Sequence, residues 1–441
     1  MNVLKFGGTS VGSVANMHMV KDIIVDGKVK IVVLSAMSGT TNALVEICRL
    51  AVSNQLEKAR FYVSNLHHDY KNVVDEMFEE SALKKEVSNY VSLIFQELES
   101  LILMPSAFLF YNTMVSKGEL LSTFIFTCFL KSQHVNVRLL PALAFMRIDK
   151  DGEPDAFYIK QNLERLIDGG LPATIYITQG FICLNNTGDI SNLERGGSDY
   201  SATIIGAALG ASEVQIWTDI DGLHTNDPRF VTDTHAISNL SFDEAAELAY
   251  FGAKILHPQT VMPAQRANIP VRLKNTMCPE SYGTLINSNA SEKGIKAIAA
   301  KDAITAIKIK SARMLQSYGF LKKVFEIFEK YETSIDMITT SEIAISLTVD
   351  RTHFLTAIVL ELEQFSTVEI DQDQSIVCLV GNQIVKHKDT FRFFQILQDI
   401  SVRMISYGGS NNNISILVHS QDKIKTLQLL NTYVFRRVNV S

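Results

Sequence analysis

Cysteine is scarce in this sequence, and no two cysteines are closely spaced. The 441 residues include five of them, Cys48, Cys128, Cys183, Cys278 and Cys378. Their odd number and wide spacing, without any C-x-x-C pair, argue against a disulfide framework and against a zinc site built from cysteine. We therefore expect reduced, packed thiols in a cytoplasmic protein.

Long uncharged hydrophobic runs are also lacking. None approaches the roughly 18 residues that a membrane-spanning helix needs. The apolar stretch in the opening residues, MNVLKFGG, is too short for a signal peptide and is broken at once by glycine. We therefore expect no membrane partner.

Neither sign of charge dominates the sequence. Lysine and arginine number 41 against 47 aspartates and glutamates, giving a net charge of -6, and like charges form no long block. This balance gives no reason to expect nucleic acid as a partner or a disordered charged tail. With 46% hydrophobic residues, a chain of this length is typical of a globular protein with two or three domains.

An alternation of strand and helix patterns fills the first 290 residues. Strands are predicted at Val3–Phe6, Lys30–Ser35, Val135–Leu140, Ala173–Ile177 and Val214–Thr218. Helices are predicted across 41–103 and at Tyr200–Gly210. Strands that alternate with helices predict an α/β domain with a mostly parallel open sheet between layers of helices.

The pattern changes after Ile286. A polar segment, NSNASEKGIK at 287–296, is typical of a linker, and a β-α-β-β-α-β order then occurs twice. The two copies share SIDMI at 334–338 and SVRMI at 401–405, and the strands predicted in them include 334–338, 368–371, 375–380 and a final one at 434–440. We predict a first domain at 1–290, a linker at 291–303, and two ferredoxin-like modules at 304–373 and 374–441. Such modules form either a ligand pocket or only a dimerisation surface.

The first segment whose residues could bind a ligand or take part in catalysis is Lys5-Phe6-Gly7-Gly8-Thr9-Ser10, at the end of a strand. Paired glycines let backbone amides face an anion, and a following helix start adds its positive end. The segment matches neither a Walker A loop nor a dinucleotide fingerprint. Taken alone, an ordinary tight turn explains it about as well.

A second strand-to-helix turn, SAMSGTTN at 35–42, is rich in hydroxyl groups. These groups and the free amides could bind phosphate or carboxylate oxygens. On this segment alone, helix capping by Thr41 or Asn42 is the better explanation.

The most informative stretch is ERGGSD at 194–199, which combines a guanidinium, two glycines, a hydroxyl and a carboxylate before a helix. Arg195 can clamp a carboxylate with two hydrogen bonds, and Asp199 could receive an ammonium group or organise a metal. WTDIDG at 217–222 ends a strand, where ligands bind in open α/β sheets. FGAKILHP at 251–258 adds a lysine, and two lysines with one arginine would neutralise a transferring phosphoryl group.

Together, KFGGTS, LERGGSD, WTDIDG with the following DPR, and FGAKILHP resemble the signature set of aspartokinases, which have the amino-acid kinase fold. The repeats resemble the paired ACT domains of those enzymes. The segment at 314–321 and SIDMITTSE at 334–342 are similar to the monofunctional, lysine-inhibited class. The match covers nearly the whole chain in the right order.

The resemblance implies that a side-chain carboxylate oxygen of aspartate attacks the γ-phosphorus of ATP, which begins lysine, diaminopimelate, threonine and methionine synthesis. It implies a catalytic set of Lys5, Asp199 and Lys254. It implies a nucleotide site at Lys5, Gly7, Gly8, Ser10, Thr218, Asp219, His224, Arg229, Lys254 and Ile255. It implies an aspartate site at Ser35, Thr41, Glu119, Arg195, Gly196, Gly197, Ser198 and Asp199.

Within that aspartate site, Glu119 would take the ammonium group, and Arg195 and Thr41 would hold the α-carboxylate. Mg²⁺ is expected to arrive with ATP rather than at a site made by the protein alone. No general base is needed, because a carboxylate is already a nucleophile at neutral pH. His224 stands where the family usually has tyrosine, so the hydrogen bond of that phenol is lost.

Regulation is expected at the first repeat. By resemblance, lysine binds Met314, Ser317, Gly319, Leu321, Ser334, Asp336, Thr340, Ser341 and Glu342. The turn at 316–321 offers amides to the effector carboxylate, while Asp336 and Glu342 pair with its two ammonium groups. A homodimer through the ACT repeats is expected, with a tetramer as the alternative.

Two rival hypotheses remain. Another amino-acid kinase, such as a glutamate 5-kinase or acetylglutamate kinase, would lack the carboxyl-terminal repeats and Glu119. A catalytically inactive amino-acid sensor would not need Lys5, Arg195, Asp199 and Lys254, which are all present.

Overall fold

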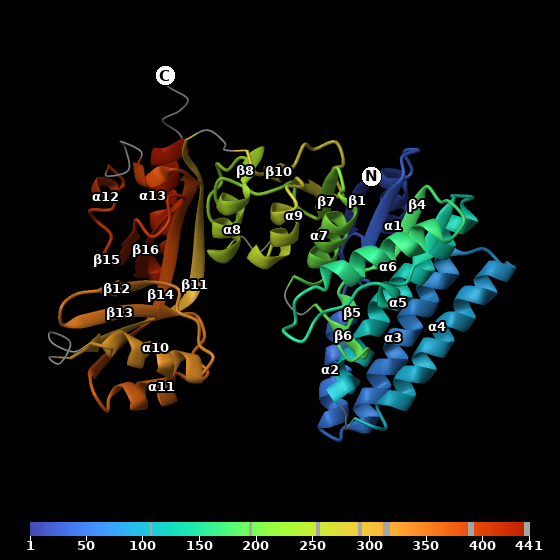
Figure 1. The fold of residues 1–441 in the computed structure, drawn as a ribbon, viewed down its shortest axis with the longest axis horizontal. Coiled ribbons are helices and arrows are strands. Elements are labelled where there is room, and N and C mark those ends of the chain that lie inside the picture. Colours follow the sequence, from blue (N-terminus) through green and yellow to red (C-terminus); the bar gives the residue numbers. More distant parts are fainter. Residues whose placement is uncertain are drawn as a thin grey trace. The chain divides into compact units, whose positions relative to one another are not determined.

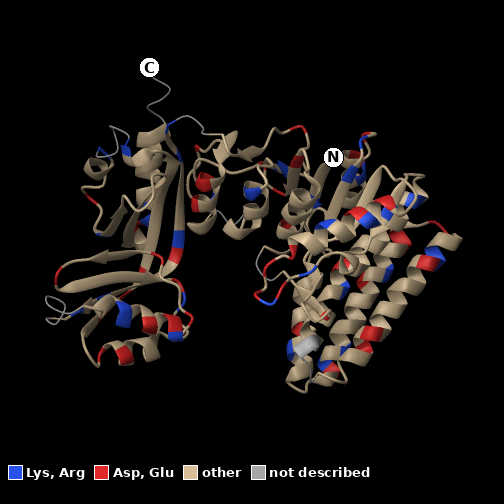
Figure 2. Ribbon diagram, in the orientation of Figure 1, with Lys and Arg blue, Asp and Glu red and all other residues tan. Residues whose placement is uncertain are grey.

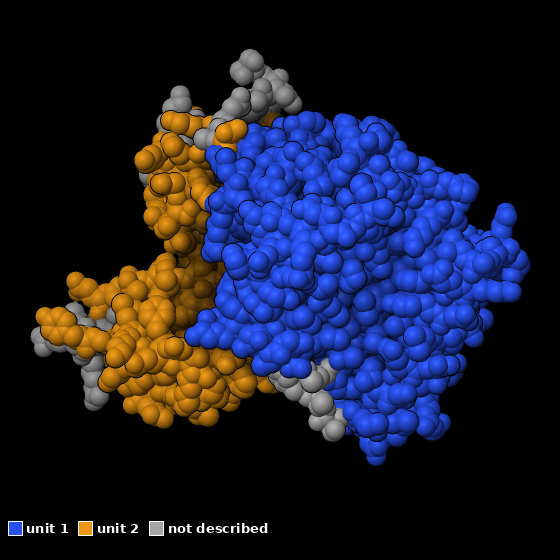
Figure 3. Space-filling view, turned by 45° about the vertical axis from the view of Figure 1, so that its right-hand side comes forward, with its two compact units in different colours: residues 1–223, 238–242, 256–288 blue, residues 224–237, 243–255, 289–441 orange. Residues whose placement is uncertain are grey.

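The computed structural model describes residues 1–105, 108–193, 196–252, 256–289, 293–311, 318–386 and 392–435, with only the backbone at 108 and 109. The chain groups into two compact units (Figure 3). The first unit contains residues 1–223, 238–242 and 256–288, and the second contains 224–237, 243–255 and 289–441. Each unit is described by itself below.

An eight-stranded sheet forms the centre of the first unit, in the order β3-β4-β2-β1-β7-β9-β10-β8. Its strands are β1 (Asn2–Phe6), β2 (Lys30–Leu34), β3 (Val137–Leu140), β4 (Ile175–Gln179), β7 (Glu213–Thr218), β8 (Asn239–Ser241), β9 (Val271–Asn275) and β10 (Thr284–Asn287). Neighbours pair in parallel except β9 with β10. Every residue of β2 and β4 is buried, as expected for parallel strands covered on both faces.

Helices cover this sheet (Figure 1). They are α1 (Val14–Ile24), α2 (Thr40–Val52), α3 (Leu56–Met77), α4 (Ala82–Leu101), α5 (Phe108–Ser132), α6 (Ala156–Asp168), α7 (Gly197–Leu209), α9 (Met262–Arg266), and the 3₁₀ turns η1 (Ala142–Ala144) and η2 (Pro258–Val261). A hairpin of β5 (Ile182–Leu184) and β6 (Ile190–Asn192) follows β4. The helical region predicted at 41–103 is thus three helices, and α3 to α5 run side by side as a bundle (Figure 1).

A six-stranded antiparallel sheet forms the second unit, in the order β12-β13-β11-β14-β16-β15. Its strands are β11 (Gly294–Lys310), β12 (Ile338–Thr340), β13 (Ala344–Val349), β14 (Thr367–Asn382), β15 (Val402–Tyr407) and β16 (Asn413–His419). Its helices are α8 (Phe242–Tyr250), α10 (Phe320–Lys330), α11 (Leu355–Leu362), α12 (Arg392–Ile396), α13 (Lys423–Phe435), and the turns η4 (Ile384–Lys386) and η5 (Ser420–Asp422). The first residue of α8 groups with the first unit. In α10, Phe320, Val324, Ile327 and Phe328 are buried at helical spacing, which packs this helix on the sheet.

The two repeats share one sheet, because β11 and β14 are 17 and 16 residues long and serve both repeats. Residues 294–303, predicted as linker, are the first part of β11, and the strands predicted at 368–371 and 375–380 are one strand, β14. The polar residues that suggested breaks lie at register shifts, where Ala303 and Asp373 have positive φ. The strand predicted at 334–338 begins only at Ile338. Val434 and Phe435, predicted as strand, end α13, and 436–440 lie outside the described residues.

Charge and hydrophobicity follow the sequence expectation. Acidic and basic side chains are interspersed along the described ribbon (Figure 2). Within the described ranges, no helix is long and apolar enough to cross a membrane.

Candidate active site

The carboxyl ends of the parallel strands bring the predicted segments together. Phe6, the last residue of β1, lies opposite Leu34 of β2 and Trp217 of β7. The turns that follow therefore leave the sheet side by side, at the edge where open α/β sheets bind ligands. Gly7 and Ser35 are the first residues after β1 and β2, and Thr218 is the last residue of β7.

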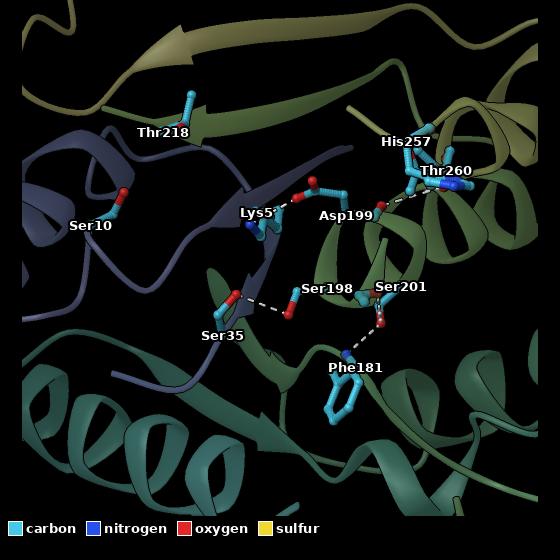
Figure 4. A network of polar contacts seen from close by, with 12 residues as sticks. Lys5, Ser10, Ser35, Phe181, Ser198, Asp199, Ser201, Thr218, His257 and Thr260 are labelled. Atoms are coloured by element: carbon cyan, nitrogen blue, oxygen red, sulfur yellow. Dashed lines mark hydrogen bonds and ion pairs between the residues drawn. The ribbon is translucent and has the colours of Figure 1, made fainter. Parts of the chain in front are cut away.

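Lys5 and Asp199 form an ion pair at this edge. Lys5 Nζ lies 2.8 Å from Asp199 Oδ1, with side chains 12% and 18% exposed (Figure 4). Asp199 stands in the first turn of α7, and β1 carries Lys5. The structure thus joins two of the three residues predicted to be catalytic, and the ammonium group is held in place from a helix start.

Two serines from different predicted segments also meet. The Ser35 hydroxyl, after β2, donates a hydrogen bond of 2.9 Å to Ser198 Oγ in α7 (Figure 4). Gly180 allows this approach, because a Cβ there would lie 2.3 Å from Ser198 Cβ. The predicted hydroxyl-rich turn is therefore connected to the GGSD segment. Gly39, in the left-handed conformation, begins α2, so the predicted capping by Thr41 or Asn42 is wrong.

Glu119 of α5 faces the same turn from the helical bundle. Its side chain accepts a hydrogen bond from the Ala36 amide at 3.2 Å. The other oxygen, Oε2, is buried and accepts no hydrogen bond from the described residues. Burial raises the pKa of Glu119 from 4.5 to about 7. An unpartnered buried carboxylate oxygen is a suitable site for a cationic group, and the role of Glu119 in binding the ammonium stays a prediction.

Two side chains that the sequence did not indicate support the turns after β1 and β2. Tyr70 of α3 is buried, and its hydroxyl lies 3.0 Å from Thr40 Oγ1 at the start of α2. Thr276, after β9, lies 2.7 Å from Ser10 Oγ through its own hydroxyl, and both are buried. These contacts join residues 30 and 266 positions apart, so no local motif could indicate them.

The glycine turn after β1 differs in part from the prediction. The Gly7 amide donates to the Trp217 carbonyl oxygen at 3.3 Å. This amide therefore makes a hydrogen bond within the protein instead of facing an anion. The next helix, α1, begins only at Val14, with Ser13 as its cap, so its amides do not belong to the GGTS turn. Gly8 remains close to the second turn, since a Cβ there would lie 3.0 Å from the Ala36 carbonyl oxygen.

The nucleotide side is described in part. The Thr218 hydroxyl donates to Asp219 Oδ1 at 3.0 Å, and the Thr218 carbonyl oxygen accepts from the Thr276 amide at 2.8 Å. His224 and Arg229 belong to the second unit, where Nδ1 of His224 lies 3.2 Å from Thr234 Oγ1 and Arg229 pairs with Asp227. Their nucleotide roles stay predictions. Arg195, Lys254 and Ile255 lie outside the described residues.

The Gly196-Gly197 turn packs against the segment that follows the predicted FGAKILHP motif. Gly196 has φ of 80°, and a Cβ there would lie 1.9 Å from Thr260 Cγ2. The Thr260 hydroxyl donates to the His257 carbonyl oxygen at 2.6 Å (Figure 4). The Thr260 carbonyl oxygen accepts a hydrogen bond from Thr203 of α7. Thr260 therefore sets the start of α7, and sequence analysis did not find it.

This contact gives a first prediction. Gly196→Ala should lower kcat/KM for the acceptor substrate by roughly 10- to 100-fold, because positive φ and the clash both displace α7. Gly196→Ala with Thr260→Ser should recover part of the loss, since serine lacks the clashing methyl but keeps the hydroxyl. Steady-state kinetics of both variants and of Thr260→Ser alone provide the measurement. A double variant no better than Gly196→Ala would contradict this steric explanation.

The first unit also has a large cavity, which is separate from the described site residues at the strand ends. About 1000 Å³ in volume, it is lined mainly by residues of α6, α7, α9 and the loop at 148–154, and by none of the predicted site residues that the structure describes. Its α7 residues, Tyr200, Ile204, Ala207 and Ala208, repeat at helical spacing and so share one face. We place the chemistry at the strand ends, because the paired and unpartnered charged groups converge there.

The predicted regulatory residues lie mostly in the first repeat of the second unit. Gly319 adopts φ of 89° and precedes α10, and Leu321 is half exposed. Ser334, Thr340, Ser341 and Glu342 are exposed, whereas the side chain of Asp336 is 1% exposed. Met314 and Ser317 lie outside the described residues. The effector role of this set stays a prediction.

Within the described part of the chain, no group of three or more histidine, cysteine, aspartate or glutamate side chains is placed to hold a metal ion. Asp199, the carboxylate that sequence analysis considered for a metal, pairs with Lys5. This donor set fits Mg²⁺ that is held chiefly by phosphate oxygens and water, as is usual for this ion at nucleotide sites.

Comparison with known families agrees with this geometry. The amino acid kinase family matches residues 1–275, and the ACT domain matches 307–360 and 377–433. The fold and the site thus define a kinase domain of the amino acid kinase type followed by ACT repeats.

Individual relatives narrow this class. Lysine-sensitive aspartokinase 3 of Escherichia coli is 36% identical over 453 residues, covering 98% of this chain and 99% of that protein. The solved structure of E. coli aspartokinase III with aspartate and ADP has a TM-score of 0.83 at 33% identity, and covers 99% of this chain and 100% of that one. The same enzyme with lysine and aspartate gives 0.81 at 33% identity, with 99% of each chain covered. The chain belongs to the aspartokinases within the amino acid kinase family.

Proposed function

We propose that this protein transfers the γ-phosphoryl group of ATP to the side-chain carboxylate of L-aspartate, giving ADP and 4-phospho-L-aspartate. The observation that carries this assignment is the unpartnered oxygen of Glu119 at the same sheet edge as the Lys5–Asp199 pair. The first supplies a negative group for the ammonium of an amino acid, and the second supplies a fixed positive charge for a phosphoryl group. The relative solved with aspartate and ADP supports the same pair of substrates.

The chain's own groups suffice for the positioning that this reaction needs. Glu119 holds the ammonium group, while Ser35 and Ser198 line the acceptor side. Lys5 neutralises charge on the phosphoryl oxygens, and Asp199 keeps Lys5 aimed from α7. Mg²⁺ bound to the nucleotide would neutralise further phosphate charge. Since the attacking carboxylate is ionised at neutral pH, alignment and charge neutralisation supply the rate enhancement.

Lysine is proposed as the inhibitor, bound at the first repeat. Support comes from the lysine-sensitive relative and from the unpartnered Oδ2 of Asp336, whose side chain is 1% exposed. An ammonium group at this oxygen would compensate a buried charge.

A homodimer through the six-stranded sheet and a cytoplasmic location complete the proposal. The outer strands β12 and β15 end the sheet, and they carry the partly exposed Ile338, Ile405 and Tyr407. The strands β12 and β15 also contact each other within the chain, and their partly exposed apolar side chains offer a surface for a second copy. The five cysteines are free, which agrees with a reducing compartment.

The test is ADP release from Mg-ATP, measured with aspartate and with glutamate, each with and without millimolar lysine. We expect aspartate-dependent turnover that lysine suppresses. Activity on glutamate but not on aspartate would overturn the acceptor assignment. Aspartate turnover that ignores lysine would keep the chemistry and remove the effector.

A further inference from the structure

Helix α8 belongs by sequence to the kinase domain but packs with the regulatory repeats. It directly follows β8, a strand of the kinase sheet, yet residues 243–255 group with the second unit. The second repeat contacts it through a hydrogen bond from Asn413 of β16 to Glu247. At its end, Gly252 lies against β11, where a Cβ would be 2.1 Å from the Ala300 carbonyl oxygen. This helix is therefore a covalent connection between the kinase sheet and the repeats.

The first repeat holds the last residue of α8 through a polar cluster around the buried side chain of Asp336. The Tyr250 hydroxyl donates to Asp336 Oδ1 at 2.7 Å, and Lys301 Nζ lies 2.7 Å from the same oxygen. Lys301 Nζ also lies 2.9 Å from Asp350 Oδ2 and 4.5 Å from the centre of the Tyr250 ring. One carboxylate oxygen of Asp336 thus joins α8, β11 and the first repeat.

The charges in this cluster do not balance. Two carboxylates, those of Asp336 and Asp350, face one ammonium group, that of Lys301. Burial opposes the charge of Lys301, but its hydrogen bonds to both aspartates raise its pKa overall, so it stays positive. The remaining negative charge is adjacent to Asp336 Oδ2, which is buried and accepts no hydrogen bond from the described residues. The free oxygen of Asp336 is therefore a place for one more cation.

We propose that Tyr250 is a coupling residue, which reports the occupancy of Asp336 by an effector ammonium group to α8 and so to the kinase domain. This inference rests on the proposed function, because it takes lysine as the effector. A cation at Oδ2 shares the single negative charge of Asp336, and its hold on Tyr250 and Lys301 weakens. Helix α8 is then less firmly fixed, and it is joined directly to β8, while Lys254 follows Tyr250 by four positions. Effector binding and turnover become linked through one hydrogen bond.

The test is Tyr250→Phe in the full-length protein. This variant keeps the ring over Lys301 and removes only the hydroxyl. We expect aspartate turnover without lysine to fall toward the lysine-inhibited level of wild type, because the lost hydrogen bond loosens α8 as bound lysine does. We expect the fold-inhibition by saturating lysine to be at least about fivefold smaller than in wild type, which is the lower end of typical allosteric coupling. Binding of radiolabelled lysine, measured by equilibrium dialysis, should persist.

The matched control is Tyr331→Phe. Tyr331 also donates to a carboxylate that a lysine pairs with, since its hydroxyl lies 2.6 Å from Glu361 Oε1 and Lys330 Nζ lies 2.5 Å from the same oxygen. This second cluster connects α10 with α11 and not with α8. Inhibition by lysine should therefore be the same as in wild type.

The possible outcomes separate the two proposals. Equal inhibition of wild type and Tyr250→Phe would overturn the coupling role and leave the proposed function intact. Loss of lysine binding together with loss of inhibition would make Tyr250 part of the effector site, which also overturns a coupling role. A wild type that turns over aspartate but does not respond to lysine would refute the effector, and the coupling with it.

Discussion

Lys5→Met should lower kcat with aspartate on the order of 10³-fold, the loss expected when a fixed charge facing a transferring phosphoryl group is removed. Lys5 Nζ lies 2.8 Å from Asp199 Oδ1, so the ammonium group is held at the strand end before substrate arrives. Methionine has a similar length and no charge, so the effect reports charge rather than volume. The measurement is kcat for ADP release at saturating Mg-ATP and aspartate.

The chain offers a matched control for this variant in Lys30. Lys30 is also a buried lysine in a neighbouring strand, paired with Asp26, but it begins β2 at the opposite edge of the sheet. Lys30→Met should leave kcat within about threefold of wild type, because Lys30 lies at the other end of the strands from the site. Its partner Asp26 is 45% exposed, so loss of the ion pair should cost little stability. Comparable loss of kcat in both variants would mean that Lys5 acts through folding alone.

The strands and turns of the site could be predicted from the sequence because each is a local pattern. Apolar β-branched runs such as KIVVL at 30–34 predict buried parallel strands, and the polar residues after them predict ligand contacts at one sheet edge. The resemblance to aspartokinases, rather than this rule, grouped Asp199 with Lys5 and Ser35. The resemblance also put Ser35 and Ser198 in one substrate site, and the structure joins them by a hydrogen bond.

The supporting contacts could not be predicted, because they join distant segments through ordinary residues. Tyr70 is one tyrosine in a helix of mixed composition, and only its contact with Thr40 gives it a role. Thr276 and Thr260 carry no motif, yet they position Ser10 and Gly196. The same limit applies to α8, since a helix between two kinase-domain segments gives no sign in sequence that it packs with the repeats.

The repeats show a different reason for error. Polar residues inside β11 and β14 suggest breaks to any rule that reads one segment at a time. In an antiparallel sheet a strand tolerates polar residues on its exposed face, and bulges at Ala303 and Asp373 absorb the change of pattern. A single long strand shared by two modules therefore cannot be predicted from its own sequence until its partner strand is known.

Glu119→Gln should raise KM for aspartate by roughly 10- to 100-fold, which is the range for losing a charged hydrogen bond to an ammonium group. Glutamine keeps the size of the side chain and its acceptor for the Ala36 amide, so kcat at saturating aspartate should change less than KM. The control is Glu97→Gln. Glu97 pairs with Lys117 of α5 and is 44% exposed, so this variant should leave KM near the wild-type value.

The pH dependence tests the same residue independently of folding. Burial raises the pKa of Glu119 to about 7, so below this pH the carboxyl is protonated and cannot pair with the substrate ammonium. KM of the wild type should therefore fall about tenfold between pH 6 and pH 8, while KM of Glu119→Gln should not change with pH.

Ionisation of Glu119 should lower the stability of the fold, although it improves the binding of aspartate. A carboxyl whose folded pKa is raised releases its proton more readily when unfolded, so its contribution to stability decreases as pH rises from 4.5 to about 7. At pH 8, Glu119→Gln should melt at or above the wild-type temperature, so that weaker substrate binding cannot be attributed to unfolding. A glutamine variant that melts lower at pH 8, with an unaltered pH profile of KM, would show that Glu119 is a structural residue and that another group receives the ammonium.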